Sequence, residues 1–425
     1  MSKTICGEPS CRVRFHTDVV CVAGKDDYIL KRGLVSDNNN TVAILLKDCR
    51  ITEVDVEAFE NNYNVQEIDL SRNKITYIKK GVFDGIRKVV ALRLSRNLLT
   101  ELPLGLFDEV PRLQRLDISD NKIMSLELGI FDKLSKLVRL EMAGNALIGK
   151  NLHPSLFDNN QNIIYLHFSM SDMSGSPDNL LHSFQSLSVL GLNNCSLAEV
   201  PKFATSSNLR TMKSLLLQSN LISSIDDPTT FAHLESLQTL DLLGNDIDSI
   251  NDNVFKPMTN LNSVDLSFNR IQHIPDNLFR DMKSVQNIDM SHNVIEVVPV
   301  NAFRGTRLKK LNLSANKISF FDNNFCLELR NSQTRLTMFQ FNDNPMQCAC
   351  LLDILKEVKK FGIAYNSEKY NGEDAVCFMT NEFNCLRQKA QLFIDISSSA
   401  FFMRSTCLNS NNTKEGACVK IKLNK

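Results

Sequence analysis

The chain has 425 residues, with 48 basic and 48 acidic side chains and a formal net charge of zero, and 43% of its residues are hydrophobic. A neutral chain has no overall field that would attract nucleic acid or an anionic membrane, so electrostatic recognition must come from local patches. The most apolar late segment, 391–403, contains Asp395 and three serines and is shorter than the about 20 apolar residues of a membrane helix. We therefore expect no transmembrane segment. Residues 1–6 contain no apolar core of a secretory leader, so we expect the leader to have been removed or the sequence to be truncated.

The first 40 residues are expected to form an N-terminal cap. Residues 12–15 and 19–22 predict a hairpin, and the cysteines of this region are Cys6, Cys11 and Cys21. Cysteines clustered at chain ends favour disulfide caps made in an oxidising compartment, and reduced thiols in a cytosolic protein are the alternative. Three cysteines leave one unpaired, and Cys49 is a candidate fourth partner.

Residues 41–345 repeat one pattern: two apolar residues separated by one residue, two variable residues, an asparagine, one variable residue and an apolar residue. Residues 68–75 (IDLSRNKI) are a clear example. The asparagine column, which we call the ladder column, comprises Cys49, Asn73, Asn97, Asn121, Asn145, Ser171, Cys195, Asn220, Asn245, Asn269, Asn293, Asn316 and Asn344. Its members lie 23 to 28 residues apart, most of them 24, which predicts about 13 structural repeats.

Each column of the repeat has a physical role. The apolar pair predicts a short strand with one inward face, and such strands stack into a parallel sheet. The asparagine amide can satisfy the bent backbone of its own and the adjacent turn, where an unmet buried group costs about 1 to 3 kcal/mol. Cys49, Ser171 and Cys195 are small donors that should weaken the column without breaking it. The predicted fold is an α/β solenoid with a concave parallel sheet and an irregular or 3-10 convex side.

A second column contains phenylalanines, usually ten residues after the ladder column. Its members are Phe59, Phe83, Phe107, Phe131, Phe157, Phe184, Phe231, Phe255, Phe279 and Phe303. At this spacing the rings are expected to form a core spine on the convex side, rather than a base-stacking or cofactor platform.

These repeats closely resemble the typical-type leucine-rich repeats of animal extracellular proteins, including insect leucine-rich immune proteins and the ectodomains of Toll-like receptors. Residues 344–355 (NPMQCACLLDIL), followed by Cys377 and Cys385, resemble the family's C-terminal flanking cap, with Ile354 where that cap often has tryptophan. The resemblance implies a horseshoe with four parts. They are an N-terminal cysteine cap (1–40), a leucine-rich-repeat solenoid (41–345), a cysteine-rich flanking cap (346–390) and a tail (391–425).

The resemblance also implies a disulfide pairing in the flanking cap. Cys348 is expected to pair with Cys377, and Cys350 with Cys385. A four-thiolate zinc site is the alternative for these cysteines. Cys407 and Cys418 are expected to close a loop in the tail, and the sequence assigns no role to Cys326.

Four sequons add candidate N-glycosylation sites, which suit an extracellular protein. They begin at Asn39, Asn194, Asn312 and Asn411. Asn312 would project from the concave face, so a glycan there would block that end of it.

The variable strand positions predict a continuous concave surface suited to long, shallow contacts. Its early repeats carry Arg72, Arg93, Arg96, Arg115 and Arg139, and arginine is well suited to binding carboxylates or phosphates. The repeats around Ser171 and Cys195 are irregular and carry Tyr165, His167, Met170, Gly191 and Leu216. Aromatic and sulfur-bearing residues are typical of interface centres, so we expect Tyr165, His167 and Met170 to form part of a docking site. A merely degenerate repeat is the alternative.

Other residues of this surface favour simpler interpretations. Asp241, Asp265 and Asp289 occupy a position where aspartate is common in the family, so they are interpreted as solvated consensus residues. His167 and His292 have no partner at metal-ligand spacing and are interpreted as ordinary exposed histidines rather than as metal ligands or pH sensors.

The sequence contains no catalytic constellation, and we expect no enzyme activity, cofactor or metal. The function that the resemblance implies is extracellular recognition of a protein or glycoconjugate partner on the concave face, in innate immunity, by a secreted protein that can dimerise or join another leucine-rich-repeat protein. The alternatives are the ectodomain of a cell-surface receptor or adhesion or guidance protein, and a cytosolic scaffold. No nucleic-acid partner is expected.

Overall fold

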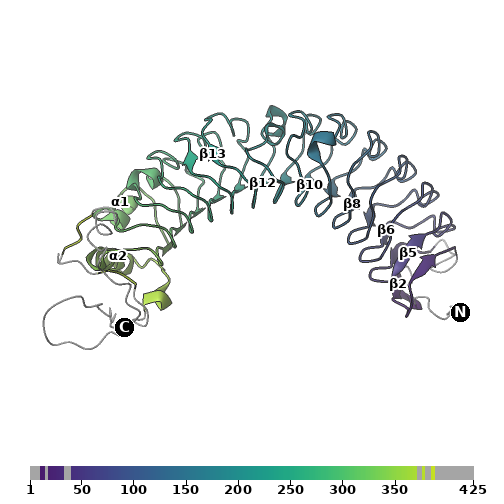
Figure 1. Cartoon of the computed structure of the whole chain (residues 1–425), viewed down its shortest axis with the longest axis horizontal. Coiled ribbons are helices and arrows are strands. Elements are labelled where there is room, and N and C mark those ends of the chain that lie inside the picture. Colours follow the sequence, from purple (N-terminus) through teal and green to yellow (C-terminus); the bar gives the residue numbers. More distant parts are fainter. Residues whose placement is uncertain (1–9, 15–17, 33–39, 371–375, 379–383, 388–425) are drawn as a thin grey trace, which may run out of the picture. The chain divides into compact units, whose positions relative to one another are not determined.

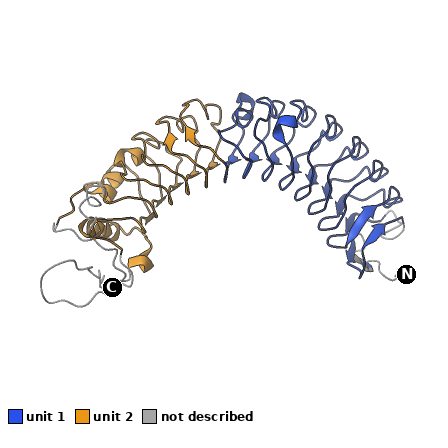
Figure 2. Cartoon of the chain, in the orientation of Figure 1, with its two compact units in different colours: residues 1–220 blue, residues 221–425 orange. Residues whose placement is uncertain are grey.

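The computed structural model describes residues 10–14, 18–32, 40–370, 376–378 and 384–387. The chain divides into two compact units, 1–220 and 221–425 (Figure 2). The division falls inside the predicted solenoid, not at either cap. In each unit, short strands lie side by side and irregular loops connect one strand to the next (Figure 1).

The first unit is built mainly from three-residue parallel strands. Its strands are β1 (Ser10–Arg14), β2 (Asp18–Val22), β3 (Tyr28–Leu30), β4 (Ala43–Leu45), β5 (Ile51–Val54), β6 (Glu67–Asp69), β7 (Ala91–Arg93), β8 (Arg115–Asp117), β9 (Arg139–Glu141), β10 (Tyr165–His167), β11 (Val189–Gly191) and β12 (Ser214–Leu216). β1 and β2 form the predicted antiparallel hairpin. The strand order is then β2-β4-β6-β7-β8-β9-β10-β11-β12, all parallel, while β3 pairs with β5 separately.

Short 3-10 helices and two α-helices complete the elements. The first unit contains η1 (Gly149–Asn151), η2 (Lys202–Ala204) and η3 (Ser207–Leu209). The second contains β13 (Ser224–Ile225), β14 (Thr239–Asp241), β15 (Ser249–Ile250), β16 (Ser263–Asp265), β17 (Asn287–Asp289), η4 (Val300–Phe303), β18 (Lys310–Asn312), α1 (Phe325–Asn331), β19 (Met338–Gln340), α2 (Cys348–Lys360) and η5 (Ser367–Tyr370). Its main sheet has the parallel order β14-β16-β17-β18-β19. No helix among the described residues is long and apolar enough to span a bilayer.

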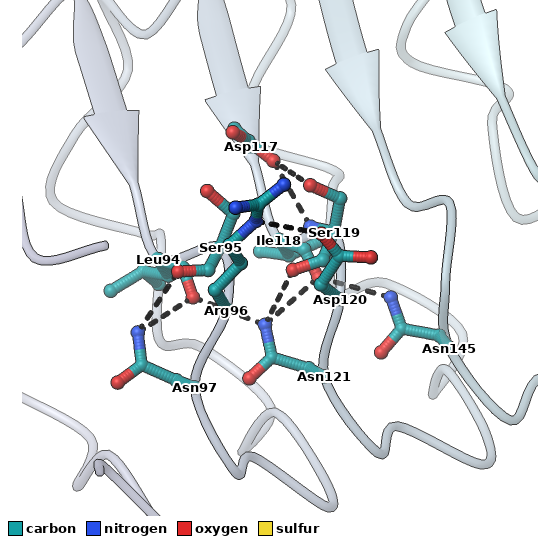
Figure 3. Close-up of polar contacts among 10 residues, drawn as sticks. All are labelled: Leu94, Ser95, Arg96, Asn97, Asp117, Ile118, Ser119, Asp120, Asn121 and Asn145. Carbon is teal, nitrogen blue, oxygen red and sulfur yellow. Dashed lines mark hydrogen bonds and ion pairs between the residues drawn. The ribbon is translucent and has the colours of Figure 1, made fainter. Parts of the chain in front are cut away.

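The ladder column is buried and joins neighbouring turns, which confirms its predicted role. Nδ2 of Asn97 donates to the carbonyl oxygens of Leu94 in its own turn (2.9 Å) and of Leu70 in the preceding turn (3.0 Å). Oδ1 of Asn97 accepts the backbone N–H of Ile75 at 3.1 Å. Asn121 repeats these bonds one turn later (Figure 3). Each amide therefore supplies the partners that the buried bends would otherwise lack.

The three exceptions in the ladder column keep part of this bonding. The Ser171 hydroxyl donates to the Asn145 carbonyl oxygen (3.3 Å), and the Cys195 thiol donates to the carbonyl oxygen of Phe168 (3.6 Å). Cys49 is buried with a free thiol. The alternative that Cys49 pairs with a cap cysteine is therefore wrong, and Cys49 belongs to the ladder column.

The residue directly before each ladder residue has the same backbone conformation in every repeat. We call these residues the turn column. Its members are Asp48, Arg72, Arg96, Asp120, Gly144, Met170, Asn194 and Ser219 in the first unit, and Gly244, Phe268, His292, Ala315 and Asp343 in the second. All have φ between 52° and 70°, in the left-handed region. Residues other than glycine rarely adopt this conformation. It occurs here because the chain must bend sharply to turn the next side chain into the ladder.

The phenylalanine column forms the expected buried spine in each unit. In the first unit, the ring centroids of Phe83 and Phe107 lie 6.5 Å apart and those of Phe131 and Phe157 lie 5.9 Å apart, with nearly parallel planes. In the second unit the spine runs from Phe231 to Phe303 at spacings of 5.5 to 6.2 Å. The rings are fully buried and therefore form part of the core in each unit.

Disulfides stabilise both ends of the described chain. Cys11 pairs with Cys21 across the β1–β2 hairpin. In the flanking cap Cys348 pairs with Cys377 and Cys350 with Cys385, which is the pairing implied by the family resemblance. Cys6, Cys407 and Cys418 lie outside the described residues.

The free thiol that the sequence did not assign lies in the last part of the solenoid, in contact with the helix α2 of the flanking cap. Cys326 is buried in α1. Oε2 of Glu357, on α2, accepts the backbone N–H groups of Cys326 (2.8 Å) and Leu327 (3.3 Å) at the start of α1. The pKa of Glu357 is raised, because the effect of burial exceeds the opposing effect of these two hydrogen bonds. The carboxylate thus joins the two helices by satisfying amides that have no partner within α1.

Candidate partner-binding face

The strands of the first unit present an open face, which we define as the side chains of the first and third residues of each three-residue strand. In the three-residue strands of the main sheet of this unit the central residue is buried and most flanking residues are less buried, so the open face is formed by these strands. In β3, outside this sheet, the central residue Ile29 is exposed instead. The parallel register aligns Arg139, Tyr165 and Val189 in one row and Glu141, His167 and Gly191 in the other. (Each row continues along the neighbouring strands.) The sequence predicts a continuous surface here, and the parallel register of the strands forms one.

A stack of planar side chains lies at the middle of this face. The guanidinium carbon of Arg139 is 3.6 Å from the ring centroid of Tyr165, and the rings of Tyr165 and His167 lie 4.5 Å apart with planes 9° from parallel. An ion pair joins Arg139 to Glu141. Burial, followed by the charge of Glu141, raises the pKa of Tyr165. The stack therefore holds its side chains in fixed positions by contacts on both faces.

Gly191 makes this arrangement possible. A Cβ atom at this position would lie 2.5 to 2.6 Å from three atoms of the His167 ring. Any other residue would force the imidazole off β11, because real Cβ atoms essentially never approach so closely. The missing side chain of Gly191 thus leaves the space in which the His167 ring packs against β11.

His167 is half-buried in this space, so the interpretation of an ordinary exposed histidine is wrong. Burial, and secondly the charge of Arg139, lowers the pKa of His167 to about 4. The imidazole is therefore neutral at neutral pH. Its Nε2 atom is buried without a hydrogen-bond partner among the described residues, which leaves an unmet polar group in the stack.

The five predicted arginines differ in their surroundings. Ion pairs join Arg93 to Glu67, Arg96 to Asp120 and Arg139 to Glu141. Arg72 and Arg115 form no ion pair with any residue in the described part of the chain. Arg72 and Arg96 belong to the turn column, whereas Arg93, Arg115 and Arg139 lie on strands. The structure thus brings only Arg139 into contact with the predicted aromatic residues.

The remaining predicted contact residues flank the stack. Met170 is in the turn column after β10 and is 52% exposed. Leu216 is half-buried at the end of β12, in the same row as His167 and Gly191. Apolar side chains therefore lie on two sides of the aromatic stack.

The acidic residues at the ends of the strands support the turns. Oδ1 of Asp117 accepts the backbone N–H (3.0 Å) and the hydroxyl (2.6 Å) of Ser119, on the side of the chain away from the asparagines (Figure 3). Asp69 bonds the N–H of Ser71 in the same way at 2.9 Å. The aspartates at this position are therefore half-buried turn-supporting residues and not the solvated residues expected from the sequence.

Two of the four sequons fall within the described residues. Asn194 is exposed in the turn column. Asn312 is half-buried; its Nδ2 donates to Oδ2 of Asp289 at 2.8 Å and its Oδ1 accepts the N–H of Ser314 at 3.1 Å. A glycan on Asn312 would therefore attach to a nitrogen that already donates a hydrogen bond to Asp289. Asn39 and Asn411 lie outside the described residues.

Sequence reasoning missed two features of the exposed surface. One is the contact between Gly191 and His167, which depends on the register between two strands. The other is Phe268, which is 53% exposed although the same chain buries its spine phenylalanines. Its signal was present in the alignment of repeats, because phenylalanine occurs once in an outward column that, apart from Met170 and His292, holds charged, polar and small residues.

Comparison with known proteins defines the family. The family described as "Leucine rich repeat" matches residues 40–99, 87–147, 210–263 and 259–318, which together cover just over half of the chain. The chain belongs to the leucine-rich-repeat family. No curated protein matches this leucine-rich-repeat chain.

Solved structures share the leucine-rich-repeat fold. A chain from the Drosophila Toll–Spätzle complex is 21% identical with a TM-score of 0.64, over 82% of this chain and 54% of its own length. Internalin InlF of Listeria monocytogenes is 18% identical (TM-score 0.58; 76% and 86% covered), and the APL1 leucine-rich-repeat domain is 20% identical (TM-score 0.54; 80% and 85% covered). This chain therefore spans about half of the matched chain from the Toll complex.

Proposed function

We propose that this leucine-rich-repeat protein is an extracellular recognition protein that binds a protein or glycoconjugate partner on the open face of its first unit. The contact surface is centred on Tyr165 and His167 of this face and on Met170 of the turn column beside it. The observation that carries the proposal is the stack of Arg139, Tyr165 and His167, which is fixed by contacts within the chain. Arginine and tyrosine are enriched at the energetic centres of interfaces, and side chains ordered beforehand lose less conformational entropy on binding.

The surroundings of the stack suit such an interface. Met170 and Leu216 supply apolar area beside the aromatic rings, while the paired charges of Arg93 and Glu67 lie further along the face. An apolar and aromatic centre with charged residues at its margin is the usual anatomy of a protein–protein contact.

Disulfides support an extracellular location. Six of the described cysteines form three disulfides, at the N-terminal hairpin and in the flanking cap. Disulfides of this kind persist in oxidising compartments and are rare in the cytosol.

An immune role is the finer part of the proposal. Its support is the likeness to a chain from the Toll–Spätzle complex, which is described as a hub in Drosophila development and innate immunity. Ectodomains from other settings have the same fold, including FLRT2 in a complex with Latrophilin 3 and Unc5D. The receptor-ectodomain alternative is distinguished by the full transcript, which for a receptor continues into about 20 apolar codons.

A comparison of two triple variants tests the proposed face. The site variant carries Tyr165→Ala, His167→Ala and Met170→Ala. The control carries Tyr63→Ala, Met124→Ala and His233→Ala, which remove the same residue types from exposed positions off the open face. Tagged proteins are incubated with the extracellular fluid of the source organism, and the captured proteins are quantified by mass spectrometry.

The expected result is a partner captured by the wild-type and control proteins and reduced at least tenfold with the site variant. The melting temperatures of both variants should stay within a few degrees of the wild-type value, because the buried central residues of the strands are unchanged. Equal capture by the two variants would show that the partner binds elsewhere.

A further inference from the structure

A second exposed aromatic pair lies in the other unit, on the turn column. Phe268 follows β16, and its ring stacks on that of His292 in the next turn, with centroids 4.0 Å apart and planes 11° from parallel. The side chain is 53% exposed. The preceding member of the column is Gly244 and a later one is Ala315, so the fold does not require an aromatic residue here.

Three carboxylates lie in register along the adjacent strands. Asp241, Asp265 and Asp289 are paired neighbours at the ends of β14, β16 and β17. Oδ1 of each accepts the backbone N–H of the residue two positions later, at 3.1, 2.9 and 2.9 Å respectively. Parallel strands lie about 4.8 Å apart, so these charges repel one another along the sheet. Burial and then the charge of Asp265 raise the pKa of Asp241.

These carboxylates lack the cationic partners that Glu67 and Glu141 have in the first unit, where Asp117, at the same strand position, likewise forms no ion pair with a described residue. Glu67 and Glu141 form ion pairs with Arg93 and Arg139. Oδ2 of Asp289 accepts a hydrogen bond from the neutral side-chain amide of Asn312 at 2.8 Å. None of the three aspartates forms an ion pair with any other residue that the structure describes. The negative charge of this row is therefore uncompensated within the described chain.

The row has the geometry of an extended surface rather than of a point site. Nowhere in the described part of the chain do three or more histidine, cysteine, aspartate or glutamate side chains converge as metal ligands. Positive charge that matches this row must therefore be distributed along the sheet. An extended polypeptide with repeated basic side chains has that distribution.

The aromatic pair adds a contact that suits the same partner. The equivalent positions of one repeat of the first unit, Asp117 and Asp120, lie on one side of the chain, away from the ladder (Figure 3). Phe268 follows Asp265 by three residues and occupies the column of Asp120. A lysine or arginine side chain over the face of an exposed aromatic ring gains about 0.5 to 1 kcal/mol.

We propose that the second unit binds an extended basic segment of a protein, whose arginine or lysine side chains pair with Asp241, Asp265 and Asp289 while one of them stacks on Phe268. This surface and its partner chemistry are separate from the proposed site on the first unit.

Peptide binding to the full chain tests the proposal. The probe is a fluorescein-labelled nine-residue peptide of alternating arginine and serine, and the comparison peptide has glutamate in place of arginine. Binding is measured by fluorescence anisotropy at low and physiological salt. We expect the arginine peptide to bind and to weaken as salt rises, because ion pairs at an exposed surface are screened.

Variants of the surface are chosen so that the fold is retained. Asp241→Asn and Asp265→Asn keep the Oδ1 acceptor, as Asn312 does naturally where its Oδ1 accepts the N–H of Ser314 at 3.1 Å. Phe268→Ala places alanine in the turn column, as Ala315 is naturally. The matched controls are Asp248→Asn, an exposed acid of the same unit, and Leu221→Ala, whose side chain is 56% exposed.

The double variant Asp241→Asn/Asp265→Asn should weaken binding of the arginine peptide at least fivefold, and Phe268→Ala at least twofold, with both controls unchanged. No binding of the arginine peptide, equal binding of the glutamate peptide, or equal effects of site and control variants would each overturn the proposal.

Discussion

The guanidinium carbon of Arg139 lies 3.6 Å from the ring centroid of Tyr165 on the neighbouring strand. The contact orders two long side chains on a surface where they would otherwise sample several rotamers. Its strength can be measured without knowledge of the partner. A double-mutant cycle with Arg139→Met and Tyr165→Leu should give a coupling of about 0.5 to 1 kcal/mol in the free energy of unfolding. The control cycle pairs Arg115→Met with Tyr165→Leu and should give a coupling near zero, and equal couplings would contradict a specific contact.

The burial of His167 makes the free energy of unfolding depend on pH. The pKa of His167 is about 4 in the folded protein against the usual 6.5, so protonation favours the unfolded chain. The stability contributed by the neutral ring is complete above pH 6.5 and is lost as pH falls towards 4. His167→Gln should therefore lose less stability than the wild type between pH 7 and pH 4.5, as measured by urea unfolding at each pH. Identical pH profiles would show that the ring is not held neutral.

Gly191→Ala provides an independent test of the burial of His167. A Cβ atom would lie 2.5 Å from the ring of His167, so the imidazole must move out. We expect a loss of about 1 to 3 kcal/mol in stability and a rise in the pKa of His167 towards 6.5, followed by NMR titration of the imidazole protons. An unchanged pKa would mean that the variant accommodates its methyl group without moving the ring.

The ladder column predicts a graded response to substitution. Asn121→Ala removes the groups that satisfy the carbonyl oxygens of Leu94 and Ile118 and the N–H of Leu99. Each unmet group costs about 1 to 3 kcal/mol, so a loss of about 2 to 5 kcal/mol is expected. Asn121→Cys should lose less, because Cys195 occupies the column naturally with its thiol bonded to carbonyl oxygens. Equal losses in the urea midpoint would argue against this role of the amide.

Periodicity was sufficient to predict the repeat and its core, because each ladder and spine position depends only on its neighbours at a fixed spacing. Asn97 and Phe107 could be placed for that reason. The environment of His167 could not be predicted, because it depends on Gly191, which the register between β10 and β11 places beside it. The exposed stack of Phe268 on His292 was missed because burial of phenylalanine is the general rule in this chain. The pairing of Cys350 with Cys385 needed the family resemblance, since spacing alone allows other pairings.

Cysteine labelling tests the proposed compartment. Three of the described cysteines, Cys49, Cys195 and Cys326, are free and buried. If Cys407 pairs with Cys418 as expected from the sequence, Cys6 is the only further thiol. Denatured, non-reduced protein purified from its native source should therefore react at four of the twelve cysteines, as counted by mass spectrometry after alkylation. Reaction at nearly all twelve would place the protein in a reducing compartment.

The central claim, that a partner docks on the aromatic centre of the first unit, is tested most directly by site-specific photocrosslinking. A benzophenone amino acid replaces Met170 in one protein and Met124 in another; both side chains are more than half exposed, but only Met170 flanks the stack. After irradiation in native extracellular fluid, the partner should become covalently attached at position 170 and not at position 124. Attachment at position 124, with none at position 170, would contradict the account.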